Sequence, residues 1–527
     1  MLRTRLFALI TGVILGLTGL APHLHAEGVR SIFSWNYRTK NVDIRTSDDL
    51  LLKARLYFPT GDAPGKVHPV VIFGNSWIVT QWEYEIPARI LASKGYIVLS
   101  YQTRGFFLSQ GNIGIGGPNE IGDIKILIDW VQSNTPADMQ NIALAGISYG
   151  GGISLLAAAQ DPRVKTAVAM NCWGDVMKSL YSEETLHNAW LKVLVKSGEI
   201  TGRLDPELYQ ITNDLRTNTN MDSMKEWAYV RSPVNYTDQL NARQVPIFVA
   251  NSHQDELFPP LQMEEFYTKL TGPKYFYIDD GVHAGSAIPG LFGRKAEVWT
   301  KVYAWLDHYL VDSNSPVPYG VNYHTRTRDV RFSEFADVKR QDLTFKPLNT
   351  TLNKDVGGYL APVISLAGNV DSNATTGKIL LNDLTTVYGE APPRVYVPAL
   401  NKMVAAVFQT DVLTHKISII GAPRLTIALP GHETPVQIVA YLYDVDSSQF
   451  ASLMTYGAIT VHEAKTSMQS YTFELGTNGY QVPAGHKMML VLDTKDPLYL
   501  APLIKPYEVD ILAEASGLTM EFPYAED

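Results

Sequence analysis

The sequence contains one cysteine, Cys172, so no disulfide can form within the chain. It also lacks an H-E-x-x-H motif and a paired C-x-x-C motif, so the kinds of zinc site that these motifs form are excluded. We therefore expect no metal and no cofactor. Cys172 follows the apolar run Thr166 to Met170, and we interpret it as a buried small residue rather than a nucleophile.

Clusters of basic residues are missing as well. The formal net charge is -9, and lysine and arginine gather nowhere along the chain, so nucleic acid is excluded as a partner. Hydrophobic residues make up 46% and charged residues 18% of the chain, as in globular proteins. A chain of 527 residues is longer than one hydrophobic core usually supports, so at least two domains are predicted. We expect a small-molecule or peptide substrate, and the oligomeric state stays open.

The first 26 residues have the pattern of a signal peptide. Arg3 and Arg5 precede an apolar run from Leu6 to Ala21, and the segment ends in the small residue Ala26. An uncleaved anchor is the alternative, but the run is short for a membrane span, interrupted by glycines and followed by proline. No other stretch is apolar enough to cross a bilayer. We expect a periplasmic or secreted protein, with no stable membrane insertion after cleavage.

The most informative stretch runs from Ile142 to Ala159. An apolar strand leads into Gly146-Ile147-Ser148-Tyr149-Gly150, and a small-residue helix follows. Strand, G-x-S-x-G and helix form the context of a nucleophile elbow, where a sharp turn exposes the serine hydroxyl and leaves no room for side chains two residues away. Ser148 is the predicted nucleophile, and the Tyr149 N–H is the predicted oxyanion donor. The alternative is a glycine-rich turn that merely contains serine.

Strands and helices alternate around this stretch. Apolar strands are predicted at residues 68–73, 96–101, 142–145, 164–169, 245–250 and 274–278, the last being the final strand expected, and a hairpin is predicted over residues 37–58. The alternation predicts a parallel sheet with helices on both faces, hence an α/β fold with ligands at the carboxyl ends of the strands. We assign residues 27–315 to this catalytic domain.

Two further regions do not follow this alternation of strands and helices. Residues 175–240 contain helical patterns from Glu184, Asp205 and Met221 without a clear strand, and we interpret them as a helical cap over the active site. Beyond Asp312 a proline-containing linker leads into short, regularly spaced strands. Residues 316–527 are therefore predicted to form an all-β, jelly-roll-like domain.

A serine nucleophile needs a base and an acid, which follow it in the order Ser, acid, His at strand ends in α/β-hydrolase folds. Asp255 lies in the loop after the strand at 245–250, with Glu256 as its rival for the acid role. His283 lies in the loop after the last predicted strand and is the predicted base. The alternative for His283 is an ordinary turn residue. His253 precedes the acid and is interpreted as a packing residue.

Together these motifs resemble the CocE/NonD family of serine hydrolases, which includes cocaine esterase and X-prolyl dipeptidyl-peptidases. The residues that carry the resemblance lie roughly between positions 40 and 510: the elbow with tyrosine after the nucleophile, Arg104-Gly105 with Ser109-Gln110-Gly111, Gly122-Asp123 before Asp129-Trp130, Gly421-Ala422-Pro423, and Ala484-Gly485-His486. The resemblance implies an α/β-hydrolase fold with an inserted cap, followed by a jelly roll, and cleavage of an ester or amide through an acyl-enzyme.

The chain departs from the family in the loop after the first apolar strand. Relatives have a tyrosine there whose hydroxyl stabilises the oxyanion, whereas this chain has Trp77. Trp77 is expected to donate through its indole or backbone N–H, or else to form a hydrophobic wall. Relatives that bind an α-amino group use carboxylates near the cap, and Asp175 and Glu256 are the candidates here. An X-Pro dipeptidyl aminopeptidase and a non-catalytic binding protein remain as alternative functions.

Overall fold

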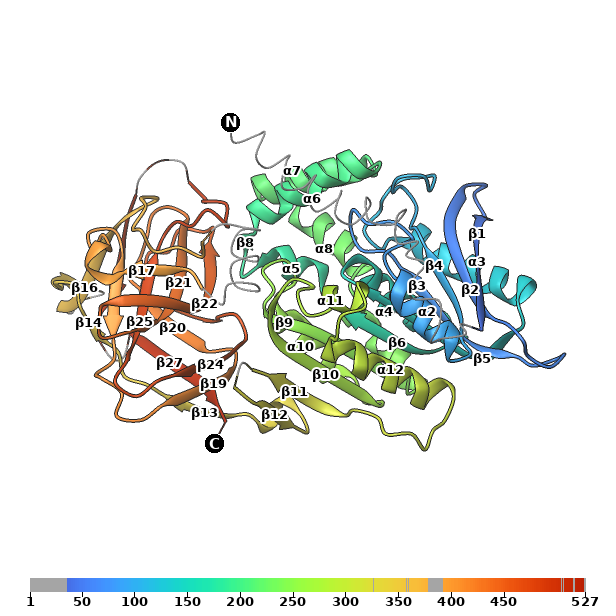
Figure 1. Ribbon diagram of the computed structural model, residues 1–527. Coiled ribbons are helices and arrows are strands. Elements are labelled where there is room, and N and C mark those ends of the chain that lie inside the picture. Colours follow the sequence, from blue (N-terminus) through green and yellow to red (C-terminus); the bar gives the residue numbers. More distant parts are fainter. Residues whose placement is uncertain are drawn as a thin grey trace.

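The computed structural model describes residues 36–525, apart from residues 326, 357, 359, 378–391, 504, 506 and 515–516. The predicted signal peptide, residues 1–26, lies outside the described residues. The chain forms an α/β domain and an all-β domain side by side, with a group of cap helices at their junction (Figure 1). Among the described helices, none combines the length and the hydropathy that a membrane span needs.

A ten-stranded sheet organises the α/β domain. Its strand order is β1-β2-β4-β3-β5-β6-β9-β10-β11-β12. The pairs from β4 to β11 are parallel, and β1, β2 and β12 add antiparallel edges. The strands are β1 (Tyr37–Arg45), β2 (Leu51–Pro59), β3 (His68–Gly74), β4 (Ile97–Tyr101), β5 (Ala137–Ile147), β6 (Val164–Met170), β9 (Ile247–Gln254), β10 (Lys274–Val282), β11 (Gly320–His324) and β12 (Asp329–Phe332).

Helices cover both faces of this sheet, as the continuous apolar runs predict. Successive side chains of a strand point to opposite faces, so in β3 Val70 and Ile72 pack into one core while Val71 and Phe73 pack into the other. The first face carries α3 (Pro118–Asn134), α4 (Tyr149–Gln160), α9 (Thr237–Ala242) and α10 (Pro260–Lys269). The second carries α2 (Glu85–Ser93), α11 (Ile288–Leu291) and α12 (Glu297–Leu310).

The prediction that the strand at 274–278 ends the sheet is wrong. After α12 the chain returns as β11, parallel to β10, and β12 then pairs antiparallel with β11. The sheet therefore continues beyond residue 315. The reason is that Gly320–His324 is short, polar in part and adjacent to Pro316 and Pro318, so its sequence has the character of a linker although it pairs as a strand.

The cap consists of α5 (Val176–Leu180), a small hairpin, α6 (Asn188–Thr201), α7 (Glu207–Thr217), α8 (Met221–Tyr229) and the 3₁₀ turn η1 (Pro233–Tyr236). The hairpin pairs β7 (Tyr181–Ser182) with β8 (Thr185–Leu186), which corrects the expectation of helix from Glu184 and of no strand. Glu183 and Glu184 both have positive φ, 47° and 55°, and this turn conformation interrupts the helical pattern.

The C-terminal domain is built from antiparallel strands. One sheet has the order β23-β20-β27-β19-β24 with β13 added at β27, a second has the order β14-β18-β25-β21-β22-β17, and a third is β15-β16-β26. Residues of the two large sheets share one apolar core. The strands are β13 (Lys339–Asp342), β14 (Lys346–Pro347), β15 (Leu352–Asp355), β16 (Leu360–Gly368), β17 (Arg394–Tyr396), β18 (Ala406–Gln409), β19 (Ile417–Gly421), β20 (Arg424–Leu429), β21 (Val436–Val445), β22 (Phe450–Val461), β23 (Gln469–Glu474), β24 (Asn478–Val482), β25 (Lys487–Asp493), β26 (Tyr507–Leu512) and β27 (Leu518–Tyr524).

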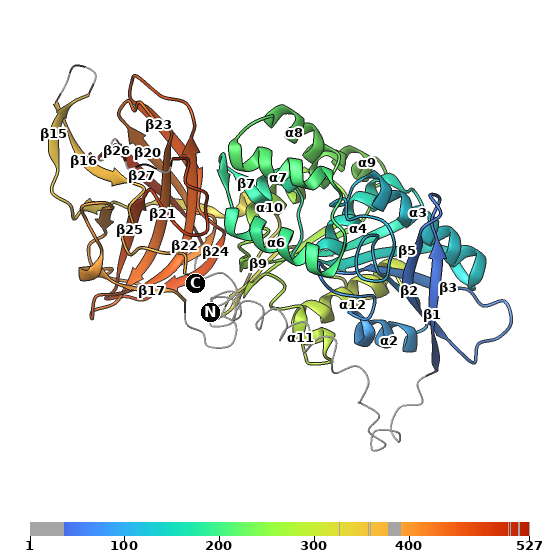
Figure 2. The same cartoon turned by 90° about the horizontal axis from the view of Figure 1, so that it is seen from above.

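The cap bonds directly to this β domain, and Figure 2 shows the cap helices next to it. The backbone N–H of Thr460, on β22, donates to the Glu183 carbonyl at 3.0 Å. The N–H of Leu500 donates to Leu186, and the N–H of Ala189 donates to Leu498. The two regions are thus joined by main-chain hydrogen bonds on both sides of the cap hairpin.

Candidate active site

The elbow at Ser148 has the backbone geometry that its sequence predicts. Ser148 lies between β5 and α4 with φ 54° and ψ -118°, and its N–H donates to the Met170 carbonyl at 2.8 Å. A Cβ on Gly150 would lie 2.0 Å from the Gly74 carbonyl oxygen, and one on Gly146 would lie 2.4 Å from the Gly150 backbone. Glycine is therefore sterically required at both positions, and the strained turn holds the serine hydroxyl out of the sheet.

Three side chains from separate loops form one hydrogen-bonded chain. The His283 Nε2 lies 3.0 Å from the Ser148 Oγ, and the His283 Nδ1 lies 3.0 and 3.1 Å from the two Asp255 carboxylate oxygens. When Nδ1 carries the proton and donates to Asp255, Nε2 is left to accept the Ser148 hydroxyl proton. The arrangement can therefore activate a hydroxyl nucleophile. The elbow motif, together with the order and strand-end positions of Asp255 and His283, predicts these three residues from the sequence.

Asp255 is oriented by its own loop. Its side chain is fully enclosed, and one carboxylate oxygen accepts hydrogen bonds from the N–H groups of Leu257 and Phe258, at 3.1 and 2.8 Å. The other oxygen lies 3.3 Å from the side-chain amide of Asn171. These bonds compensate the buried charge and aim the carboxylate at His283.

Glu256, the rival for the acid role, faces the β domain instead. Its carboxylate is hydrogen-bonded to the hydroxyl of Tyr456 on β22, and burial together with this carboxylate raises the Tyr456 pKa well above its ordinary value. The structure therefore brings Asp255, and not Glu256, to His283.

Tyr149 and Trp77, the two predicted oxyanion residues, lie beside Ser148. Tyr149 is the first residue of α4, where backbone N–H groups have no partner within the helix, so its N–H is available to an oxyanion. The indole N–H of Trp77 donates to the Ser197 hydroxyl of the cap at 3.0 Å. Its ring packs edge-on against Phe106 and Tyr149. The Trp77 ring is thus a wall that is held by the cap, and its backbone N–H is the remaining candidate donor.

The side chain of Tyr149 takes part in a buried network that the sequence did not reveal. Its hydroxyl donates to Glu120, whose carboxylate also accepts the N–H groups of Gly114 and Gly117 at 2.9 and 2.7 Å. Burial raises the pKa of Glu120, and burial with the nearby Glu120 charge raises the pKa of Tyr149 well above its ordinary value. The network fixes the start of α4 to the loop before α3. The only sequence signal was a glutamate in the first turn of a helix.

An apolar pocket of about 100 Å³ opens at Ser148 and extends under the cap. Its walls come from the elbow, from Trp77 and Trp173, and from α5 to α8; among the described residues that line it, none is charged. The cap supplies aliphatic side chains such as Leu180, Leu191, Leu194, Leu208, Ile211 and Met224. Such a pocket binds an apolar group next to the nucleophile.

Asp175 and Glu256, the candidates for binding an α-amino group, do not line this pocket. The Asp175 carboxylate caps α5 by accepting the N–H groups of Met177 and Lys178, at 2.9 and 3.1 Å. Glu256 lines a larger cavity of about 490 Å³ between the cap, α10 and the β domain. The structure therefore separates both carboxylates from the apolar pocket at Ser148.

Two residues outside the hydrogen-bonded chain have packing roles. Cys172 is buried, as predicted, and burial and the Asp255 charge raise its thiol pKa well above the ordinary value. His253 is also buried and stacks on Tyr323 with an interplanar angle of 14°. Burial lowers the His253 pKa to about 4, so its ring is neutral at pH 7.

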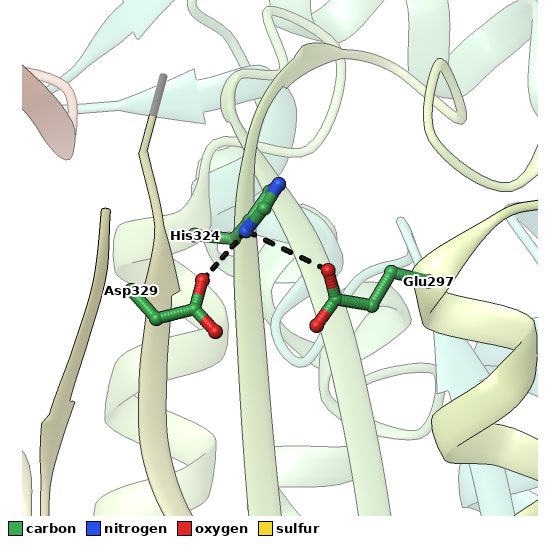
Figure 3. A group of neighbouring side chains, drawn as sticks. All are labelled: Glu297, His324 and Asp329. Atoms are coloured by element: carbon green, nitrogen blue, oxygen red, sulfur yellow. Dashed lines mark hydrogen bonds and ion pairs between the residues drawn. The ribbon is translucent and has the colours of Figure 1, made fainter. Parts of the chain in front are cut away.

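One group of potential metal ligands lies at the β11–β12 edge of the sheet. Figure 3 shows the His324 ring between the carboxylates of Asp329 and Glu297, and its Nδ1 lies 2.6 and 3.7 Å from their oxygens. Lys301 pairs with Glu297 at 2.8 Å, and Arg331 lies 3.7 Å from Asp329. The carboxylates are thus already paired with cations, and the group joins α12 to β11 and β12 as an ion-pair cluster.

The fold and this site define the class of the protein as an α/β hydrolase with an inserted cap and a C-terminal β domain, as predicted. Residues 48–285 match the X-Pro dipeptidyl-peptidase (S15) family. Through this domain the chain resembles the CocE/NonD, X-Pro dipeptidyl-peptidase-like hydrolases, and the resemblance seen in its motifs is supported by this match.

Individual relatives are distant. An uncharacterized 31.7 kDa protein of Escherichia coli is 27% identical over 294 residues, which cover 51% of this chain and 100% of that protein. An aminopeptidase from a Thaumarchaeota archaeon shares the fold with a TM-score of 0.70 at 14% identity, over 95% of this chain and 99% of the other. A CocE/NonD family hydrolase from Staphylococcus aureus has a TM-score of 0.67 at 12% identity, over 93% and 94%.

Proposed function

We propose that this protein is a periplasmic or secreted serine hydrolase that cleaves carboxylic esters with an apolar acyl group. The observation that carries the proposal is the hydrogen-bonded chain of Ser148, His283 and Asp255, whose Ser148 lines a pocket that has no charged residue among its described lining residues. The location is inferred from the signal-peptide pattern of residues 1–26.

In the proposed reaction Ser148 Oγ attacks the ester carbonyl carbon while His283 Nε2 takes the hydroxyl proton. The N–H groups of Tyr149 and Trp77 stabilise the oxyanion of the tetrahedral intermediate. The carbon–oxygen bond to the leaving alkoxide then breaks, and His283 returns the proton to that oxygen. Water, activated by His283, attacks the acyl-enzyme in the same manner and releases the carboxylic acid and the free Ser148 hydroxyl.

An X-Pro dipeptidyl aminopeptidase is the second candidate, because the catalytic domain matches that family. Such an enzyme must hold a protonated amine close to the scissile bond, which requires an acceptor or a carboxylate in the acyl site. Asp175 is occupied as a helix cap and Glu256 bonds to Tyr456, so neither is oriented toward the acyl pocket. This argues for esters. A non-catalytic binding protein would have no need of the oriented Ser148–His283–Asp255 chain.

The test compares wild-type protein with Ser148→Ala on p-nitrophenyl esters and X-Pro p-nitroanilides, with labelling by a fluorophosphonate probe. We expect ester turnover and probe labelling in the wild type. In the variant we expect turnover to fall by at least about 10⁴-fold, because the oxyanion hole alone leaves only residual catalysis. Probe labelling is expected to be lost as well, because the probe bonds covalently to the serine hydroxyl. Equal labelling of Ser148→Ala would overturn the assignment. Preference for the anilides would favour the peptidase.

A further inference from the structure

Glu83 lies in the segment between the oxyanion loop, residues 74–77, and helix α2, and the reaction described above does not use it. Its carboxylate accepts two hydrogen bonds from one residue of that loop: the Ser76 N–H donates to Oε2 at 2.6 Å, and the Ser76 hydroxyl lies 2.5 Å from Oε1. Because one bond goes to the backbone N–H and the other to the side-chain hydroxyl of the same residue, the two bonds fix both the position and the orientation of that peptide unit. Ser76 immediately precedes Trp77.

The same cluster also contacts the elbow. The Ser76 hydroxyl lies 3.1 Å from the Ile147 carbonyl oxygen, and the Ile147 N–H donates to the hydroxyl of Tyr84 at 2.8 Å. Tyr84 is fully buried, stacks on Phe73 of β3 and is hydrogen-bonded to Glu83. The N–H of the residue before Ser148 is therefore bonded to Tyr84, and its carbonyl oxygen lies within reach of the Ser76 hydroxyl, whose shorter contact is to Glu83.

Asn75, the residue before Ser76 in the oxyanion loop, is held by a separate set of hydrogen bonds. Asn75 is fully buried, its side-chain oxygen accepts the Thr103 N–H at 2.7 Å, and its amide donates to the Val79 carbonyl at 2.9 Å. The loop is therefore anchored through Asn75 and through Ser76, and the next peptide carries the N–H of Trp77. The orientation of that N–H depends on the Glu83 anchor.

We propose that Glu83 is a positioning residue for the oxyanion hole: its carboxyl group clamps Ser76 so that the Trp77 N–H and the Tyr149 N–H face the same oxyanion. The inference rests on the proposed hydrolase function. An oxyanion hole acts through donors that are fixed before the charge develops, and the loss of one donor costs about 10²- to 10³-fold in kcat. A loosened loop misaligns the donor without removing it, so the expected loss is smaller.

The test is Glu83→Leu, which keeps much of the side-chain volume and removes both acceptors. We expect kcat to fall by at least about tenfold while KM changes by less than about twofold, because the misaligned donor affects the transition state rather than substrate binding. The inhibition constant of an alkyl boronic acid, which forms a tetrahedral adduct with Ser148, is expected to rise by about the same factor as kcat falls.

Three variants distinguish this role from general loss of structure. Glu83→Gln accepts the Ser76 N–H and donates to the Ser76 hydroxyl, which turns to Ile147, so we expect kcat within about threefold of wild type. Ser76→Ala removes only the hydroxyl bond and is expected to give an intermediate loss. Glu85→Leu is the matched control, because Glu85 bonds to Arg55 and Arg89 and not to the oxyanion loop. It is expected to leave kcat and the boronic acid inhibition constant unchanged.

Unchanged kcat and boronic acid inhibition in Glu83→Leu would overturn the proposal, and so would parallel increases in KM and the inhibition constant at constant kcat. If Glu83→Leu does not fold, a Ser76→Ala variant with wild-type kcat overturns it instead. These outcomes leave the hydrolase assignment intact as long as Ser148→Ala is inactive. An active Ser148→Ala variant would instead refute the hydrolase mechanism itself.

Discussion

At the scale of single residues, the elbow depends on close backbone contacts that no side chain can enter. Gly150 shows this most clearly, because a Cβ there would lie 2.0 Å from the carbonyl oxygen of Gly74, a backbone atom that cannot rotate away. Either β3 or the start of α4 would have to move. Both carry groups of the active site, so strain at this glycine affects stability and activity together.

Gly150→Ala is therefore expected to lower the free energy of unfolding by about 3 kcal/mol or more and to abolish ester turnover. The control is Gly122→Ala, since no heavy atom lies within 4 Å of a Cβ at this helical position. It is expected to leave activity unchanged and to stabilise the protein by about 0.5–1 kcal/mol. Urea denaturation of both variants measures the difference. A stable, active Gly150→Ala protein would contradict the geometry of the elbow.

Sequence reasoning was strongest for residues with a local signature. Ser148 stands in a motif whose glycines have one steric explanation, and Asp255 and His283 follow at strand ends in the expected order. It was weaker for residues whose role depends on a distant partner. The Trp77 indole bonds to Ser197, which a single sequence does not name because this contact depends on tertiary structure. The Asp175 carboxylate, in contrast, makes a local contact, because it accepts N–H groups at the start of its own helix.

At the scale of elements, the cap determines the shape of the apolar pocket beside Ser148, the proposed acyl site. Helices α5 to α8 present aliphatic side chains to the space beside Ser148, and the volume of about 100 Å³ limits the length of an acyl group. For the proposed ester substrates, burial of each methylene is expected to stabilise the bound molecule by about 0.8 kcal/mol until the pocket is full. Longer chains must then displace the cap or stay in solvent.

We expect kcat/KM for p-nitrophenyl esters to rise with acyl length over the first few carbons and then to fall. Leu194→Trp is expected to move this maximum to shorter chains, with a loss of about tenfold or more for the longest esters, because Leu194 lines the pocket. Lys192→Trp on the exposed side of α6 is the control and is expected to keep the wild-type profile. A maximum that is unchanged in Leu194→Trp would mean that the acyl group binds elsewhere.

The sequence predicted the elements of the sheet better than those of the cap. Runs such as residues 70–73 and 247–250 are apolar because helices cover both faces of the sheet, so a strand is predicted there without knowledge of the neighbouring strands. The β7–β8 hairpin has only two residues per strand and a Glu-Glu turn, and it is stabilised by bonds to the β domain. Similarly, β11 is a strand because β10 offers it a free edge, which its own residues do not indicate.

At the scale of the whole molecule, buried carboxyl groups link stability to pH. Burial raises the pKa to about 7 for each of Glu83, Glu264, Asp279 and Asp493. Because the folded state holds these protons more tightly than the unfolded chain, folding is favoured while they are protonated, and this contribution is lost as the pH rises through 7. Burial lowers the pKa of His187 and His253 to about 4. Their contribution to folding stability is therefore gained as the pH rises from about 4 to 6.5.

The melting temperature is therefore expected to fall as the pH rises from about 6.5 to 8, where the histidine contribution is already complete. Asp279→Asn, which cannot ionise, is expected to reduce this fall and to be more stable than the wild type at pH 8, by on the order of 1–3 kcal/mol. Thermal unfolding at several pH values measures both. A melting temperature that rises steadily from pH 6.5 to 8 in the wild type would contradict the prediction.

The hydrogen bonds between the cap hairpin and β22 have a consequence for the order of synthesis. The hydroxyl of Thr185 lies 2.8 Å from that of Thr460, across 275 positions of the chain. A ribosome completes the sheet and Ser148 long before β22 emerges, and domains fold largely as they are made. The nascent polypeptide therefore carries Ser148 under a cap that still lacks its hydrogen bonds to the β domain, and the cap hairpin gains these bonds only after translation has reached the C-terminal domain.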